Sequence, residues 1–285
     1  MKAFNEVKIR RSEVLQLILL HLIYAQQSSR EVFFQGGTAI RWCYGGTRFS
    51  EDLDFVTPLE IGQLQKLILA VTKSLEREAV AHFGPGAVTV SQKPSRDNAL
   101  KVLFTYAPVS GRDRTAVKVE FERLAAGRVP GTGRMVIGSM PSAARLIAEG
   151  EFKVPRSSSV VLVETPTEIV SDKIRALLER PYLKGRDLYD LWFLSSVKGE
   201  KAAPETVLAK LGMYNAEFTA ARQPGFFSQP GVRETAQIKK ALETDLPRFI
   251  GDKAFEALSE GGFGAIADAV RQVFLGLLSG GFRLP

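Results

Sequence analysis

The chain has 285 residues, 45% of them hydrophobic, which can fill the core of one large domain or of two ordinary ones. Lys and Arg number 38 against 31 Asp and Glu, and the net charge of +7 favours polyanionic partners without requiring them. The single cysteine, Cys43, excludes an intramolecular disulfide framework, and two histidines are too few for a His/Cys zinc cluster. Any metal must therefore be held by oxygen ligands, which suits Mg²⁺ or Mn²⁺.

The opening residues 1–27 place a basic stretch before an apolar one, which is the outline of a secretion signal. Polar residues interrupt the apolar stretch, however, and no small-residue cleavage site follows it. Apolar residues recur instead at helical spacing, so we expect an amphipathic first helix. No other stretch reaches the ~20 apolar residues of a membrane span. The sequence therefore predicts a cytoplasmic protein with no membrane partner.

In chain order, the first half alternates strands and helices. A glycine pair ends the first strand, and Thr38 can cap the helix that follows, which would leave the first backbone N–H groups of the helix free to meet an anion. Pro58 closes the second strand, and the next helix carries apolar residues at the spacing of an amphipathic helix. The predicted strands are 31–35, 52–57, 86–92, 99–109 and 115–123, and the predicted helices are 38–44 and 59–82.

The second half reads as helical after one further strand. Residues 124–159 are rich in Gly, Pro and Ser and give no clear pattern. A strand at 160–164 leads to a helix at 166–180, which begins with a proline and can be capped by Thr165 or Thr167. Further helices are expected at 185–197, 204–214, 233–246 and 263–280. We therefore predict an α+β protein with a mixed-sheet domain at 1–165 and an all-helical domain at 166–285.

Two carboxylates on one strand give the first chemical signal. In "EDLDF", Asp52 and Asp54 are two residues apart, so on a strand both project from one face, about 7 Å apart along the backbone. Such carboxylates repel one another unless a cation lies between them, and Mg²⁺ is the natural cation for oxygen ligands. Upstream, Gly36 and Gly37 open a helix and can bring backbone N–H groups close to a triphosphate.

A third carboxylate lies on a later strand. In "VKVEF", Glu120 shares a face with Lys118, and Glu122 lies two residues further along the same face. We prefer Glu120 because it lies among the apolar residues of the strand. Three carboxylates on neighbouring strands beside a phosphate-binding turn are what two-metal phosphoryl or nucleotidyl transfer needs. The alternative is that the D-x-D pair, common in exposed turns and helix caps, has no catalytic role.

The segment "GGTAIRWCYGGTRFSEDLDF" resembles the first motif of the polymerase-β-like nucleotidyltransferases. In its fuller form, G-G-T-A followed by R-x-S-x-D-h-D-F, it is similar to the AbiEii/AbiGii toxin family. The resemblance implies that the two aspartates bind metal and that the glycine turn holds the nucleotide. The implied nucleotide-binding residues are Gly36, Gly37, Thr38, Arg48 and Ser50.

A second segment, "SDKIRALLERPYLKGRDLYDLWFL", resembles later motifs of the same family, in which a lysine contacts the triphosphate and an R-D-x-x-D run adds an acid. The resemblance places these roles on Lys173, Arg186, Asp187 and Asp190, with Lys173 and Asp190 catalytic. Each has a structural alternative, since Lys173 could be solvated and Arg186 with Asp190 could form a simple i, i+4 ion pair. The resemblance covers residues 33 to about 195, and residues from 200 onward show nothing diagnostic.

Together these features imply a Mg²⁺-dependent nucleotidyltransferase that moves NMP from NTP to an acceptor hydroxyl. The resemblance implies that it would be the toxin of a type IV-like toxin–antitoxin or phage-defence system, with the 3′ end of tRNA as a candidate acceptor and a cognate antitoxin as a candidate partner. Asp52, Asp54 and Glu120 would bind the metals, Glu120 could also orient or deprotonate the acceptor oxygen, and Lys173 would stabilise triphosphate charge.

Two other hypotheses remain open. The same fold could serve a phosphotransferase or an enzyme that nucleotidylates a protein. Alternatively, the chain could be a non-catalytic module that binds nucleic acid or protein.

Overall fold

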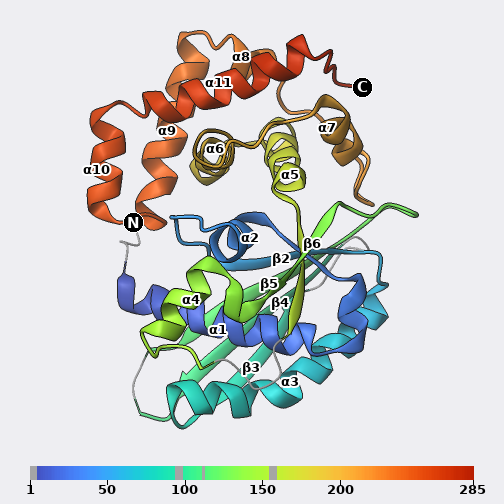
Figure 1. Cartoon of the computed structure of the whole chain (residues 1–285), viewed down its shortest axis with the longest axis vertical. Coiled ribbons are helices and arrows are strands. Elements are labelled where there is room, and N and C mark those ends of the chain that lie inside the picture. Colours follow the sequence, from blue (N-terminus) through green and yellow to red (C-terminus); the bar gives the residue numbers. More distant parts are fainter. Residues whose placement is uncertain (1–4, 94–98, 111–112, 154–158) are drawn as a thin grey trace. The chain divides into compact units, whose positions relative to one another are not determined.

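The computed structural model describes residues 5–93, 99–110, 113–153 and 159–285. It divides into two compact units, Asn5–Glu164 and Thr165–Pro285. The first unit contains a mixed sheet with helices, and the second contains helices and no strand (Figure 1). The predicted α+β class is therefore confirmed.

The sheet of the first unit has seven strands in the described residues, in the order β3-β4-β5-β2-β1-β7-β6. β2 pairs in parallel with β5, and β1 in parallel with β7, while the other neighbours are antiparallel. This arrangement puts β5, which is distant from β2 in the sequence, beside β2 in the sheet. The strands are β1 (Phe33–Gln35), β2 (Asp52–Thr57), β3 (Gly86–Lys93), β4 (Ala99–Pro108), β5 (Thr115–Arg123), β6 (Thr132–Val136) and β7 (Val160–Glu164).

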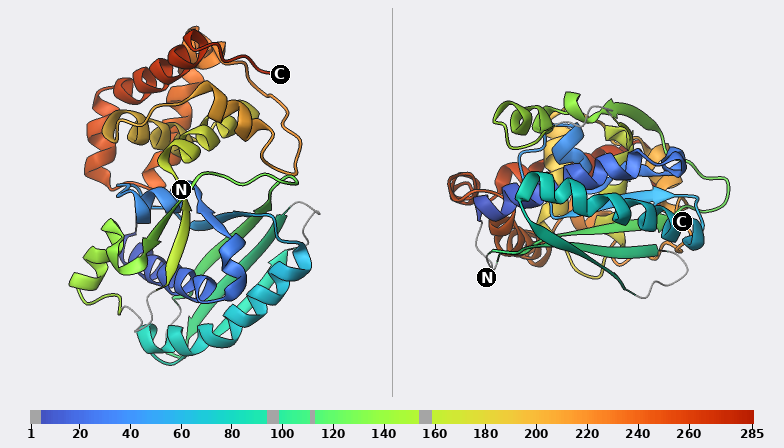
Figure 2. Two further views of the ribbon diagram at one scale, coloured as in Figure 1. Left: turned by 45° about the vertical axis from the view of Figure 1, so that its right-hand side comes forward. Right: turned by 90° about the horizontal axis from the view of Figure 1, so that it is seen from below.

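One face of the sheet is packed against α1 (Glu6–Tyr24) and α3 (Ile61–Phe83), which contact one another, as the view from below in Figure 2 shows. The alternating apolar and acidic residues of β2 explain why the helices cover this face. Leu53 and Phe55 are buried against it, while Asp52 and Asp54 point to the other side of the sheet. The Phe55 ring lies 5.2 Å from that of Phe121 on β5 and 6.3 Å from that of Tyr24 on α1. The apolar face therefore forms the core and leaves the polar face available for chemistry.

The first helix is not amphipathic as predicted. Residues 13–24 are all buried, because α1 packs against the sheet as well as against α3. The polar residues that interrupt its apolar sequence have specific partners inside. The buried Glu13 carboxylate, for example, accepts a hydrogen bond of 2.9 Å from Arg41 of α2 (Gly36–Cys43).

The segment at 124–159 that the sequence left unassigned contains regular structure. It includes β6, which lies at the edge of the sheet, and the helix α4 (Pro141–Ala148), preceded by the short helix η2 (Ile137–Ser139). β6 is only five residues long, and its side chains alternate between exposed and half-buried. A short edge strand of this kind lacks the apolar run by which a strand is recognised in a sequence.

The second unit begins with α5 (Pro166–Glu179), whose first turn is capped by Thr165, the first of the two predicted caps. The predicted helices at 185–197, 204–214, 233–246 and 263–280 are present, and the unit has further helices at 225–228 and 252–260. The remaining helices of the unit are α6 (Gly185–Trp192), η3 (Phe193–Val197), α7 (Pro204–Leu211), α8 (Gly225–Ser228), α9 (Val232–Asp245), η4 (Leu246–Arg248), α10 (Asp252–Glu260) and α11 (Gly264–Ser279). The first unit also contains the short helix η1 (Gln27–Glu31).

Within the described ranges, no single helix has the length and apolar character to cross a membrane. The bent pair α10 and α11, with 71° between the two helices, meets that criterion only when both are taken together.

Candidate active site

The register of β2 and β5 brings the predicted acids together. Asp52 lies opposite Lys118 and Asp54 lies opposite Glu120 on the adjacent parallel strand. Since neighbouring strands are about 4.8 Å apart and paired residues project to the same side, the three carboxylates share one face of the sheet. Glu122 lies opposite Val56, one step further along, so the register favours Glu120 as the third acid.

The glycine turn lies directly against the second aspartate. Gly36 has φ +77°, a left-handed conformation that favours glycine, and a Cβ built there would lie 2.8 Å from Asp54 Oδ2. At Gly37, a Cβ would collide with the guanidinium of Arg48 and approach Ser50 Oγ to 3.0 Å. The predicted nucleotide-binding turn and the predicted metal-binding strand are therefore in contact within one unit.

We predict that Gly36→Ala strongly lowers any activity of this site. The added methyl group meets the Asp54 carboxylate, and the left-handed conformation itself costs an L-residue about 1–2 kcal/mol. Gly62→Ala is the matched control, because no atom lies within 4 Å of a Cβ there and the residue lies in α3. Transfer activity and the thermal midpoint of both variants would be compared, and an active Gly36→Ala protein would contradict the close fit.

The start of α2 differs from the prediction in one respect. The helix begins at Gly36 with Gln35 as its N-cap, so Thr38 is not the cap. The Thr38 hydroxyl instead donates a hydrogen bond to the carbonyl oxygen of Asp52, and the side chain is fully buried. The side chain of the N-cap residue Gln35 makes no capping hydrogen bond, so the N–H groups of the first turn are suited to an anion, whereas Thr38 ties the helix to β2.

A buried glutamine that the sequence did not single out supports the same region. Gln16 of α1 is fully buried, and its amide donates to the carbonyl oxygens of Ser50 (2.7 Å) and Glu51 (3.2 Å). Its own oxygen accepts a hydrogen bond of 3.2 Å from the Trp42 indole of α2. Gln16 therefore links α2 to the segment that enters β2 at Asp52. A polar residue inside an apolar run was the only sign of it in the sequence.

Of the two R-x-S residues, Arg48 is almost completely buried and donates a hydrogen bond of 2.8 Å to the carbonyl oxygen of Phe49. Ser50 is also buried. Both side chains pack against Gly37, so they hold the glycine turn in place.

Two lysines accompany the acids. The Lys118 ammonium lies 2.9 Å from Asp52 Oδ2 and 2.6 Å from Glu120 Oε1, and Lys101 of β4 lies 2.7 Å from Glu120 Oε2. Burial raises the pKa of Glu120, but the hydrogen bonds from Lys101 and Lys118 outweigh burial and leave that pKa below its usual value. Burial lowers the pKa of Lys118, yet its bonds to Glu120 and Asp52 hold that pKa above the ordinary range. Glu120 is therefore a firmly ionised carboxylate, which suits a cation ligand better than a general base.

The donor set fits a hard divalent cation. Carboxylate oxygens of Asp52 and Glu120 already converge on one positive group, the Lys118 ammonium, and Asp54 lies beside them on the same face. Across the described ranges, no three acid, histidine or cysteine side chains are gathered closely enough to hold a metal ion as they are placed. A cation shared by Asp52 and Glu120 would compete with the Lys118 ammonium for their oxygens.

In the helical unit, the predicted residues form a buried ion-pair cluster. Lys173 of α5 lies 3.0 Å from Asp187 Oδ1 and 2.7 Å from Asp190 Oδ2, both on α6, and Arg180 pairs with the other oxygen of Asp187. Lys173 therefore has two carboxylate partners, and it is only 8% exposed. The alternative of a solvated Lys173 is therefore wrong.

The predicted i, i+4 pair is replaced by other contacts. Arg186 lies with its guanidinium 5.1 Å from the centroid of the Phe249 ring, and its backbone N–H donates to Asp245 of α9. Asp190 instead binds Lys173. The lysine, the two aspartates and Arg180 together carry two positive and two negative charges, which balance one another.

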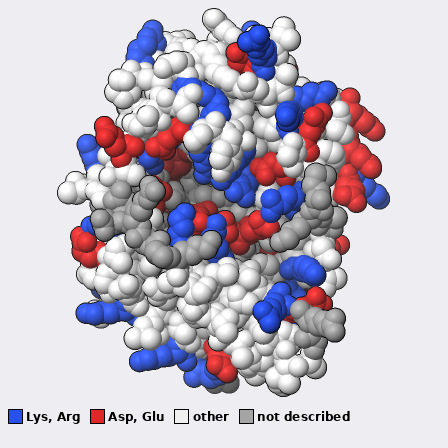
Figure 3. Space-filling view, turned by 180° about the vertical axis from the view of Figure 1, so that it is seen from behind, with Lys and Arg blue, Asp and Glu red and all other residues white. Residues whose placement is uncertain are grey.

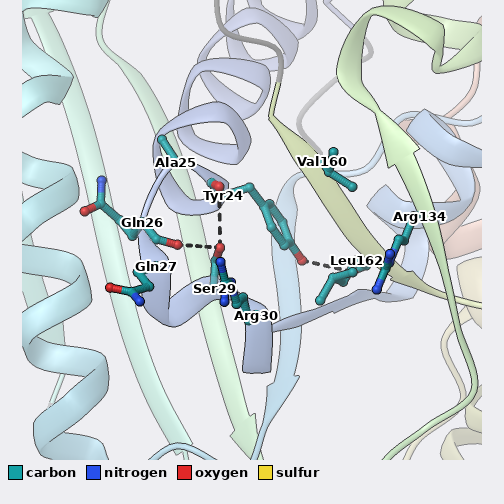
Figure 4. Close-up of a pocket in the computed structure, with 9 residues that line it drawn as sticks. All are labelled: Tyr24, Ala25, Gln26, Gln27, Ser29, Arg30, Arg134, Val160 and Leu162. Carbon is teal, nitrogen blue, oxygen red and sulfur yellow. Dashed lines mark hydrogen bonds between the residues drawn. The ribbon is translucent and has the colours of Figure 1, made fainter.

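A separate cavity of about 710 Å³ lies between the end of α1 and strands β6 and β7. Figure 4 shows Gln26 and Gln27 on one side of Tyr24, whose hydroxyl binds the carbonyl oxygen of Leu162, and Arg134 on the other. None of the residues that line it is acidic or belongs to the predicted site. This cavity therefore does not supply the ligands of a metal centre.

The excess of positive charge is not gathered into one continuous area on the face shown in Figure 3, where Lys and Arg alternate with Asp and Glu. The net charge of +7 is thus consistent with contact to a polyanion at several points rather than on one basic surface of that face.

Comparison with known proteins points to one family. The family model described as "Nucleotidyl transferase AbiEii toxin, Type IV TA system" matches residues 17–272. Two solved structures from Helicobacter pylori share the fold. JHP933 has a TM-score of 0.56 at 16% identity, covering 97% of this chain and 96% of its own. A second protein, named as a candidate nucleotidyltransferase, has a TM-score of 0.53 at 17% identity, covering 97% and 98%. No curated protein matches the chain.

Proposed function

The chain belongs to the nucleotidyl transferase AbiEii toxin family of type IV toxin–antitoxin systems, and on that premise we propose that it transfers NMP from an NTP to an acceptor hydroxyl with the help of Mg²⁺ or Mn²⁺. In this reaction a bond forms between the acceptor oxygen and the α-phosphorus. The bond from the α-phosphorus to the bridging oxygen breaks, and pyrophosphate leaves with that oxygen. The acceptor proton passes to solvent or to a nearby base.

The observation that carries the proposal is the contact between the glycine turn and the acids. Gly36 lies against Asp54, and Asp54 lies opposite Glu120 on the next strand. Phosphate groups bound by the N–H groups at the start of α2 would therefore lie beside the carboxylates. A nucleoside triphosphate bound together with a divalent cation needs both kinds of group in one place.

Asp52 and Asp54 would hold the cation, with Glu120 as third ligand. When bound, a divalent cation supplies charge stabilisation to the phosphoryl group as it is transferred. The backbone of Gly36 and Gly37 would orient the triphosphate, with Arg48 and Ser50 holding the turn in place.

The roles proposed for Lys173 and Asp190 rest on the family resemblance and on their charge. Lys173 would contact the triphosphate only by exchanging a carboxylate partner for a phosphate, because both of its aspartates are within hydrogen-bonding distance. Asp190 would then keep the lysine in position.

An Asp190→Asn variant should therefore raise the KM for NTP more than it lowers kcat, as measured from initial rates of labelling at a series of NTP concentrations.

The acceptor that we propose is RNA, with the 3′ end of tRNA as the first candidate. The net positive charge supports a polyanionic acceptor, and the toxin–antitoxin setting of the family implies a cognate antitoxin. The test is incubation of the purified protein with each NTP, labelled at the α or at the γ phosphate, and with total RNA or total protein.

Label from the α position in a nuclease-sensitive pool is the expected result. Transfer of the γ label would show a phosphotransferase, and label in a protease-sensitive pool would show a protein acceptor. If no pool takes up label from any NTP, the chain is better described as a binding module.

A further inference from the structure

Lys118 connects two of the three proposed metal ligands. It lies opposite Asp52 on the neighbouring strand and two residues before Glu120 on its own strand, and one face of the sheet carries all three side chains. Its ammonium is 2.9 Å from one carboxylate and 2.6 Å from the other. The position of Lys118 is thus fixed by the register of β2 and β5 and is not an accident of a long side chain on an open surface.

An ammonium group and a divalent cation compete for these oxygens. Both need the same carboxylate lone pairs, so a cation that binds Asp52 and Glu120 together must displace Lys118. The lysine stem is flexible and 36% exposed, so the ammonium can move away. It would nevertheless lose two charge-assisted hydrogen bonds unless another anion replaced them.

The proposed reaction supplies such an anion. A nucleoside triphosphate enters together with the cation, and its phosphate oxygens accept the hydrogen bonds that an ammonium donates. A cation arriving alone displaces Lys118 with no compensation, whereas a cation arriving with the triphosphate provides the displaced lysine with a new partner.

We propose that Lys118 is an exchangeable counter-ion that moves from Asp52 and Glu120 to the triphosphate when the cation binds, and so makes cation binding and nucleotide binding depend on one another. The proposal rests on the nucleotidyltransferase function proposed above. It assigns Lys118 a role that the sequence motifs do not give it.

Lys101 offers a matched comparison. It contacts Glu120 at 2.7 Å, carries the same charge and lies on the neighbouring strand β4. Among the ion pairs of the described residues, Lys101 contacts Glu120 and not Asp52, so a cation can bind the aspartate pair without displacing Lys101. If net charge alone changes the affinity, the two lysine variants should show similar changes. If exchange of the counter-ion changes it, removing Lys118 should have the larger effect.

The experiment measures two affinities of the full chain after treatment with a chelator. Electron paramagnetic resonance of free Mn²⁺ gives the affinity for the ion alone. Equilibrium dialysis gives the affinity for labelled α,β-methylene analogues of ATP, GTP, CTP and UTP, each at saturating Mn²⁺. The proteins compared are wild type, Lys118→Met and Lys101→Met.

For Lys118→Met we expect about tenfold tighter binding of Mn²⁺ alone and about tenfold weaker binding of the preferred analogue at saturating Mn²⁺, shifts within the usual range of coupling between sites. Shifts in opposite directions distinguish exchange from a damaged fold, which would weaken both. Lys101→Met should show a smaller shift in each affinity. Circular dichroism checks the fold, and Lys118→Gln serves as a second variant if the methionine protein does not fold.

The inference is overturned if wild type binds the analogue with Mn²⁺ and both Lys118 variants keep the two wild-type affinities. It is also overturned if Lys101→Met reproduces both shifts at full size, since net charge would then be sufficient. A wild-type protein with no Mn²⁺-dependent binding of any analogue overturns the proposed function, and the inference with it.

Discussion

Replacing Asp54 by asparagine is expected to abolish transfer of label from an α-labelled NTP while the protein remains folded. The change removes one proposed cation ligand, and the loss of about 4 kcal/mol of transition-state stabilisation corresponds to about 1,000-fold in rate. The Asp54 side chain is half-buried at the polar face, so an isosteric amide leaves the apolar core untouched. The measurement is the initial rate of labelling, with circular dichroism to confirm the fold.

Glu120→Gln and Glu122→Gln provide a comparison on the neighbouring strand. Both glutamates lie on the same face, but Glu120 is level with Asp54 and Glu122 is level with Val56. We expect a large loss of activity for Glu120→Gln and a small one for Glu122→Gln.

If Asp54→Asn keeps its wild-type rate, the carboxylates of β2 are not the cation site and the proposed mechanism is wrong.

The common face of Asp52 and Asp54 and the position of the glycine turn could be predicted from the sequence, because each depends on local rules. The alternation of a strand places Asp52 and Asp54 on one face wherever that strand lies in the sheet. A glycine pair between a strand and a helix indicates a turn with little steric restriction. These features needed no knowledge of tertiary contacts, and the structure brings the turn against Asp54.

The lysine partners could not be predicted in the same way. Lys118 meets Asp52 only because β5 pairs with β2 in parallel and in one particular register, although 65 residues lie between Asp52 and Lys118 in the sequence. A shift by one residue would move Lys118 to the opposite face. Gln16 was missed for a related reason, since its partners Trp42, Ser50 and Glu51 lie on other elements.

The cap of α2 shows how a local rule can be overridden. Thr38 is a good N-cap residue by type, but the helix starts two residues earlier, where Gly36 adopts a left-handed conformation. The Thr38 hydroxyl then finds an acceptor in the backbone of Asp52. The same hydroxyl therefore fixes the distance between the helix and the acid-bearing strand instead of closing the helix.

Asp187→Asn is expected to destabilise the protein by about 3–5 kcal/mol at pH 7, because it removes one carboxylate from a buried cluster and leaves the positive charges of Lys173 and Arg180 poorly compensated. Asp187 is only 2% exposed, and the asparagine has nearly the same shape, so the effect comes from charge and not from packing. Urea unfolding of the full chain measures it. Asp268→Asn, at an exposed position of α11, is the control and should change stability by less than about 0.5 kcal/mol.

The same variant should also lose a pH dependence that wild type shows. Burial alone would raise the pKa of Asp187, but the charges of Lys173 and Arg180 outweigh burial and hold that pKa well below its usual range. A carboxyl group whose pKa is lower in the folded than in the unfolded state stabilises the fold fully above the unfolded value, which is about 3.9 for aspartate. That stabilisation is lost as the pH falls below this value toward the folded pKa.

The difference in unfolding free energy between wild type and Asp187→Asn should therefore be constant from about pH 7 to pH 5 and should shrink as the pH falls below about 4. Asp268→Asn is the control in these measurements too, because its carboxylate is exposed on α11. A difference that stays constant down to pH 2 would mean that Asp187 is not held ionised by the cluster. In that case Lys173 would be bound less firmly to α6 than its ion pairs indicate, and the proposed exchange of a carboxylate for a phosphate would cost the lysine fewer contacts.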